Sequence, residues 1–147
     1  MVDSGNSGPG GNGRNDPTAL AGALLLTRAL GQSVPLPMVV LAADGSLAYF
    51  NRAAEALMGA SFEEVGPLPA EVWWAMWAPT NMEGTPIPLE RLPGMVALQK
   101  QRPAHGWIDF VGLDGVHRRI EGTAFPLESP DGQLLGSIAL FWEPADD

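Results

Sequence analysis

The sequence has no cysteine, only two histidines and a single tyrosine in 147 residues. The lack of cysteine excludes disulfide bonds, thiolate zinc sites, iron–sulfur clusters, a cysteine nucleophile and a cysteine–flavin photoadduct. Ser61, Ser129 and Ser137 have no histidine nearby and no glycine-flanked turn, and the chain has no phosphate-binding loop. The sequence therefore predicts a protein that is not an enzyme and that binds no metal.

Basic residues are also scarce, with eight Lys and Arg against seventeen Asp and Glu and a net charge of −9. Binding to a nucleic-acid backbone needs a concentrated basic surface, and the nearest approach to one is the pair Arg118 and Arg119. The longest apolar run, Ala19 to Leu26, is shorter than the ~20 residues that span a bilayer. No secretory signal is visible. We expect neither nucleic-acid binding nor membrane insertion, and a cytoplasmic location.

The length and the hydrophobic content of 46% fit one domain with its own core. Residues 1–16 are rich in Gly, Asn and Ser, and this composition predicts a flexible tail. Pro17 opens a leucine-rich stretch that ends at Gly31, which predicts an N-terminal helix over residues 17–31. This helix is too apolar to stand alone in water. We expect it to lie on a sheet or on a second copy of the chain.

The predicted strands are short and apolar, and they are residues 38–42, 47–50, 107–111, 116–125 and 134–142. The predicted helices lie between the second and third strands, at 52–59, 70–77 and 89–101, with a helical turn at 61–64. Asp44-Gly45 indicates a tight turn, Asn51 a helix cap, and Ser61 with Glu64 a capping box. Five antiparallel strands with helices grouped in the middle indicate an α+β domain. The last strand is apolar on both faces, which favours a central position, with the mid-chain helices on one face and the N-terminal helix on the other.

Three blocks of the sequence resemble the PAS family in their order and spacing. They are PMVVLAADGSLAYFNRAAEALMG, EGTPIPLERLPGMVALQKQRP and HGWIDFVGLDGVHRRIEGTAFPLESPDGQLLGSIALFWE. The resemblance covers residues 36–143, and it implies a five-stranded antiparallel sheet with short helices on one face and an N-terminal cap helix. It also implies a bacterial sensory or interaction module whose relatives bind haem, flavin, metabolites, lipids or nothing.

A pocket under the helices is part of what the resemblance implies. Trp73, Trp74 and Trp77 share one face of the predicted helix 70–77, where they either line a site for an apolar or planar ligand or fill the core. Both interpretations stay open from the sequence. The candidate lining residues are Asn51, Trp73, Met76, Trp77, Phe110 and Phe125.

The choice of cofactor is narrowed by the position of the histidines. His105 and His117 lie at strand ends, whereas the haem-binding relatives mostly carry the ligand on the preceding helices, so haem is not expected. A non-covalent flavin or a lipid-like ligand stays open. Arg118 or Arg119 could bind a carboxylate in the pocket, although pairing with neighbouring acidic residues is favoured.

Two functions follow from these expectations. One is a sensory module that binds a small apolar or planar ligand and signals through a homodimer, formed by helix 17–30 and the sheet face, or through a separate effector protein. The other is a ligand-free interaction or dimerisation module with a filled core. The sequence is also compatible with a fragment of a longer kinase or phosphatase.

Overall fold

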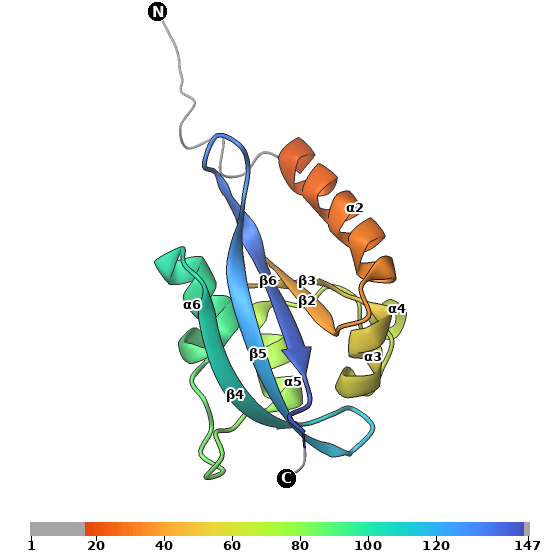
Figure 1. Ribbon diagram of the computed structural model, residues 1–147. Helices are drawn as coiled ribbons and strands as arrows, with labels where there is room; N and C mark the ends of the chain where they lie inside the picture. The colour runs from red at the N-terminus through yellow and green to blue at the C-terminus, as the bar shows by residue number, and fades with distance from the viewer. Residues whose placement is uncertain (1–16, 146–147) are drawn as a thin grey trace, which may run out of the picture.

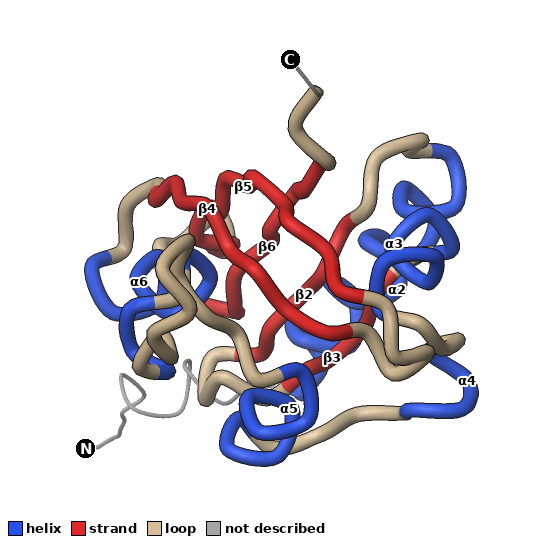
Figure 2. The backbone as a smooth tube through the Cα atoms, turned by 90° about the horizontal axis from the view of Figure 1, so that it is seen from below, coloured by secondary structure: helices blue, strands red, loops and turns tan. Residues whose placement is uncertain are grey.

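The computed structural model describes residues 17–145, so the expected flexible tail, residues 1–16, lies outside the described residues. The fold is a five-stranded antiparallel sheet in the order β3-β2-β6-β5-β4, with helices on both faces (Figures 1 and 2). The strands are β2 (Met38–Ala42), β3 (Leu47–Phe50), β4 (Ala104–Val111), β5 (His117–Glu128) and β6 (Leu134–Trp142). The predicted α+β class and the central position of the last strand are confirmed.

Two strands are longer than the sequence predicts. β4 begins at Ala104, which pairs with Ala124, and β5 continues to Glu128, which pairs with Leu134. Pro126 lies within this extension of β5 although it has no N–H for the ladder. It is tolerated because β4 pairs with β5 only as far as Ala124, so that edge of β5 is free at Pro126.

The helices between β3 and β4 begin where the sequence signals place them. They are α3 (Arg52–Met58), α4 (Phe62–Val65), α5 (Ala70–Trp77), the 3-10 helix η1 (Leu89–Arg91) and α6 (Pro93–Lys100). Asn51 caps α3, and Ser61 forms the expected capping box with Glu64. The single helix predicted over 89–101 is wrong, because Pro93 forces Leu92 into an extended conformation and starts a new helix.

The inner face of the sheet, which carries Ile108, Phe110, Ile120, Ala139 and Phe141, is covered by the mid-chain helices. In Figure 2 the strands run between α6 on one side and α3 on the other, with α5 closing the space below them. α6 approaches closely because Ala97 packs on Ala124 and Ala139, all three almost fully buried. The Ser137 hydroxyl donates a hydrogen bond of 3.0 Å to the Gly94 carbonyl of α6.

The outer face is only partly covered by α2 (Pro17–Ser33), which lies on the opposite side of the molecule from α6 (Figure 1). Its C-terminal end contacts the sheet at Gly31, where an added Cβ would lie 2.7 Å from the Met38 Cε atom. Leu25, Leu26 and Leu30 remain 73%, 64% and 56% exposed. The expectation that the N-terminal helix covers this face therefore holds over β3 and β6 and fails over β4, where Trp107 is 42% exposed. None of the helices within residues 17–145 is both long and apolar enough to cross a membrane.

Candidate functional site

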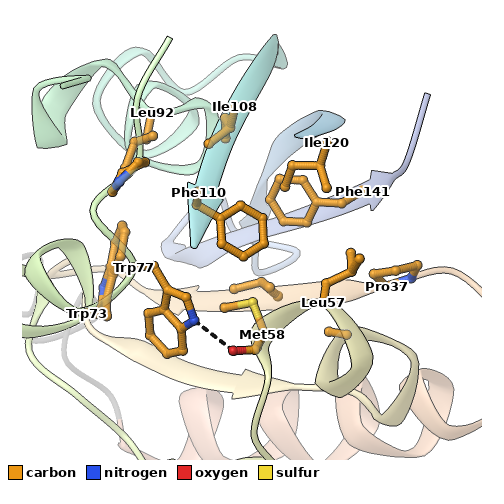
Figure 3. Close-up of a pocket in the computed structure, with 13 residues that line it drawn as sticks. Pro37, Leu57, Met58, Trp73, Trp77, Leu92, Ile108, Phe110, Ile120 and Phe141 are labelled. Carbon is orange, nitrogen blue, oxygen red and sulfur yellow. Dashed lines mark hydrogen bonds between the residues drawn. The ribbon is translucent and has the colours of Figure 1, made fainter. Parts of the chain in front are cut away.

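A cavity of about 100 Å³ lies between the inner face of the sheet and helices α3 and α5 (Figure 3). Every strand except β3 contributes to its wall, and the surface it presents is entirely apolar. The lining residues are Pro37, Val39, Ala54, Leu57, Met58, Trp73, Trp77, Pro79, Leu92, Ile108, Phe110, Ile120 and Phe141. Ile108 and Phe110 are two positions apart on β4, so their side chains point to the same face of the sheet. Ile120 of β5 lies directly opposite Ile108, and its side chain reaches the same space.

Trp73 and Trp77 of α5 form one wall, and the indole N–H groups of all three tryptophans of this helix donate to backbone carbonyls. The Trp77 Nε1 atom donates to the Met58 carbonyl at 3.0 Å, the dashed line in Figure 3. The Trp73 Nε1 atom donates to the Gly45 carbonyl at 2.9 Å, and the Trp74 Nε1 atom donates to the Ile87 carbonyl at 2.8 Å. These bonds fix the rings of α5 against α3, the β2–β3 turn and the loop before η1.

The opposite wall includes Leu57 and Met58 of α3. An ion pair in the β4–β5 hairpin holds the end of this helix. Arg118 donates from Nη1 to the Leu57 carbonyl at 3.0 Å and binds Asp114 through both Nη atoms, at 3.0 and 2.8 Å. This hydrogen-bonded guanidinium lowers the pKa of Asp114 to about 2, and the carboxylate raises the pKa of Arg118. Arg118 therefore positions Leu57 and Met58 and does not bind a carboxylate in the cavity, which agrees with the favoured interpretation of the sequence.

Of the candidate lining residues, the structure brings Trp73, Trp77 and Phe110 together in the cavity wall. Met76 is not part of the wall and is 39% exposed. Trp73 and Trp77 are four positions apart and share the side of α5 that faces the sheet. Met76 is turned by about 100° from Trp77, toward solvent.

Phe125 and Asn51 are also absent from the wall. Phe125 follows Ile120 by an odd number of residues along β5, so its side chain points to the outer face. Asn51 is fully buried, but its amide binds only backbone atoms of the chain. Placing these two residues in the lining was wrong. For Phe125 the face of the strand was misassigned, and for Asn51 the backbone partners of a helix-capping residue were overlooked.

Sequence reasoning missed most of the aliphatic wall. Ile108 and Ile120 could have been found. Ile108 is two positions from the expected Phe110 and therefore points to the same face of β4, and Ile120 lies opposite Ile108 on β5. Leu92, Pro37 and Pro79 could not, since they stand in connections whose path depends on the finished fold.

The outer face carries further charged pairs. Arg119 binds Asp109 through Nε at 2.8 Å and Nη2 at 2.9 Å, and this contact lowers the pKa of Asp109. His105 lies 2.8 Å from Glu121, and His117 lies 3.7 Å from Asp109. Both histidines are at the surface, away from the cavity, as the sequence predicts. Within residues 17–145 no cluster of three His, Asp or Glu side chains could hold a metal ion.

The cavity does not fit a haem or a flavin. The wall contains no histidine, its one residue able to ligate haem iron is Met58, and none of its side chains has a free hydrogen-bonding group for the polar edge of an isoalloxazine ring. Pockets for drug-sized ligands measure roughly 300–1,000 Å³, several times the volume found here.

Solved structures share this architecture. The PAS domain of BvgS from Bordetella pertussis has a TM-score of 0.56 and 17% identity, over 84% of this chain and 87% of that chain. The PAS domain of nitrogen regulation protein NR(II) from Vibrio parahaemolyticus has a TM-score of 0.56 and 18% identity, over 81% and 98%. The LOV domain of a blue-light activated histidine kinase from Erythrobacter litoralis has a TM-score of 0.59 and 20% identity, over 77% and 99%. No model of a protein family and no curated protein matches the sequence.

The strand order, the helices inserted between β3 and β4, and the cavity beneath them define an α+β domain that can enclose a small site against its sheet. Among such domains, the solved structures above identify the type: the chain folds as a PAS domain. The resemblance stated from three sequence blocks is thereby confirmed for the fold. At 17–20% identity these similarities establish the fold alone. The ligand and the partner must be inferred from the residues of this chain.

Proposed function

We propose that this chain is a sensory signalling module of the bacterial cytoplasm that binds a small apolar ligand and performs no catalysis. The observation that carries the proposal is the apolar cavity walled by Trp73, Trp77 and Phe110. Burial of apolar surface stabilises a bound molecule by roughly 25 cal/mol per Å², so such a wall favours a ligand without charge. The names of similar structures, a nitrogen regulation protein and a light-activated kinase, agree with a signalling role.

The proposed output is a change in dimerisation or in contact with a separate effector protein. The proposal rests on the route from the cavity to α2. Ala54, Leu57 and Met58 of α3 line the cavity, and Asn51, the cap of α3, donates a hydrogen bond of 3.1 Å to the Gly31 carbonyl in α2. A displacement of α3 by a ligand is therefore transmitted to the helix that exposes Leu25, Leu26 and Leu30.

A ligand-free interaction or dimerisation module is the second candidate function. The observation that favours it is the small volume of the cavity in a core whose other large side chains, such as Phe50 and Val40, are almost fully buried. In this alternative the exposed leucines of α2 bind a partner at all times.

Mass spectra of the purified protein under native and denaturing conditions distinguish the two functions. We expect a non-covalent adduct that is present in the native spectrum and lost on denaturation, together with a doubled protein mass. A bare mass, even after small apolar compounds are added before the measurement, would contradict ligand binding and support the ligand-free module. A monomer would contradict the homodimer and direct the search to an effector protein.

A further inference from the structure

The wall of the cavity has no free hydrogen-bonding group. The indole N–H of Trp73 is bonded to the Gly45 carbonyl and that of Trp77 to the Met58 carbonyl, so neither is free, and the other wall residues are aliphatic, phenylalanine, proline or methionine. A hydroxyl or amide placed there loses its hydrogen bonds to water and gains none, which costs about 1–3 kcal/mol in proteins. A water molecule is disfavoured for the same reason, since it needs two to four polar partners. The chemistry of the wall therefore selects a ligand without polar groups.

The volume of the cavity sets the size of that ligand. An engineered apolar cavity of roughly 150 Å³ stays dry and binds benzene or xenon. The cavity here is about 100 Å³, so its occupant is no larger than benzene.

The wall is also difficult to enlarge. Trp77 is 4% exposed, and Phe110 and Ile120 are each 5% exposed within the packed core. The hydrogen bond from Trp77 to Met58 joins two walls, and Arg118 holds the Leu57 carbonyl of α3 from outside. Admitting a three-ring flavin requires α5 and α3 to separate, which breaks these bonds.

From these observations we infer that the ligand of this module is a non-polar molecule of benzene size or smaller, such as a gas or a short hydrocarbon, and that the cavity takes neither flavin nor haem. This inference rests on the proposed function, because it names the ligand class of the same site. It departs from the light-sensing structures that share the fold.

Xenon is the first probe, with the isoleucine methyl groups of the whole chain observed by NMR. We expect xenon to shift the methyl signals of Ile108 and Ile120, which line the cavity, and to leave Ile138 unchanged. Ile138 lies in the separate groove under α2, next to Leu26 and Leu30. A shift at Ile138 alone would place the apolar site under α2 and overturn the inference.

Benzene and phenol test the polarity of the site. Benzene at ten times its Kd should raise the Tm by roughly 5 °C, by mass action. Phenol should bind at least about ten-fold more weakly, because its hydroxyl finds no partner. Equal binding of the two would contradict the non-polar wall.

A matched pair of variants on α3 locates the binding. Ala54→Leu places three more carbon atoms in the cavity and should abolish both the benzene shift and the xenon signal. Ala56→Leu makes the same change at an exposed position of the same helix and should abolish neither. Should Ala54→Leu fail to fold, the methyl shifts of the unmodified chain decide the question.

The outcomes separate this inference from the proposed function. Binding of FMN or of a fatty acid that shifts Ile108 and Ile120, without binding of benzene, would overturn the inference and leave the ligand-binding sensor standing. Failure of xenon, benzene, FMN and fatty acid alike would overturn both and leave the ligand-free module.

Discussion

Asn51 uses all the hydrogen-bonding capacity of its side chain inside the protein. Its Oδ1 atom accepts from the backbone N–H groups of Met38 and Ala54, at 2.9 and 3.0 Å. Its Nδ2 atom donates to the carbonyls of Gly31 and Leu36, at 3.1 and 2.9 Å. Only an amide offers two donors and two acceptor positions in this space. One side chain thus joins α2, the linker, β2 and α3.

Asn51→Asp tests this role with little change in volume. The carboxylate still accepts from Met38 and Ala54, but it faces the Gly31 and Leu36 carbonyls with no hydrogen to donate. We expect the free energy of unfolding at neutral pH to fall by about 3–4 kcal/mol, because the Gly31 and Leu36 carbonyls lose their donors and a negative charge is introduced into the core. Urea denaturation followed by circular dichroism measures the change.

Asn81→Asp is the matched control. Asn81 accepts from the N–H groups of Glu83 and Thr85 through Oδ1, and a carboxylate preserves both bonds. The control should stay within about 0.5 kcal/mol of the parent. Equal losses at the two positions would show that the contacts of Asn51 with α2 and the linker contribute little to stability.

Among the elements, the hairpin between β4 and β5 is tied to the end of α3 by charge. Asp114 precedes the turn at Gly115, accepts from the Val116 N–H, and binds Arg118, which holds the Leu57 carbonyl. The carboxylate is partly exposed, with 36% of its side chain open to solvent, so salt weakens the pair.

This pair predicts a loss of stability in acid. The pKa of Asp114 is about 2 in the folded chain and about 3.8 without the contact, so the unfolded chain takes up a proton first. The stabilisation is complete above pH 3.8 and is lost as the pH falls toward 2, and Asp109, whose pKa is lowered by Arg119, contributes in the same direction. Asp114→Asn should flatten the decline in the free energy of unfolding between pH 4 and pH 2, measured by urea titration.

Glu83→Gln, which removes one negative charge from an exposed loop, controls for the change in net charge. An identical acid profile for Asp114→Asn and the parent would contradict the role of this pair.

The elements also show how far the sequence could predict the structure. The positions of the strands, the turns at Gly45 and Gly115, and the caps at Asn51 and Ser61 follow from local signals, whereas the start of β4 and the end of β5 do not. The cavity wall was predictable where it follows strand parity or helix spacing, as at Phe110, Trp73 and Trp77. Leu92 and Pro79 belong to the wall, but they lie in connections whose path is set only by tertiary packing. Asn51 is not part of the wall because its side chain binds backbone groups that are distant in the sequence, such as the Gly31 carbonyl.

At the scale of the whole molecule, α2 is the surface through which the proposed dimer would form. The chain carries a net charge of −9, which opposes the approach of two copies. Arg28 is the only charged residue of α2, and its guanidinium lies 5.0 Å from the centre of the Tyr49 ring. Two copies that meet at α2 therefore bring together leucines and no acidic side chains of this helix.

The double variant Leu26→Gln, Leu30→Gln tests this arrangement. Both leucines are more than half exposed and line the groove beside Ile138, so their replacement should leave the fold intact. A buried leucine contributes about 1.5–3 kcal/mol, and a two-fold interface contains each leucine twice. The Kd of the proposed dimer should therefore rise at least about 100-fold, as measured by analytical ultracentrifugation. Leu113→Gln, at a 41% exposed leucine in the β4–β5 turn, should leave the dimer unchanged. A dimer that survives the α2 substitutions must associate through another surface, and the uncovered outer face around Trp107 is then the next one to test, because Trp107 is 42% exposed there.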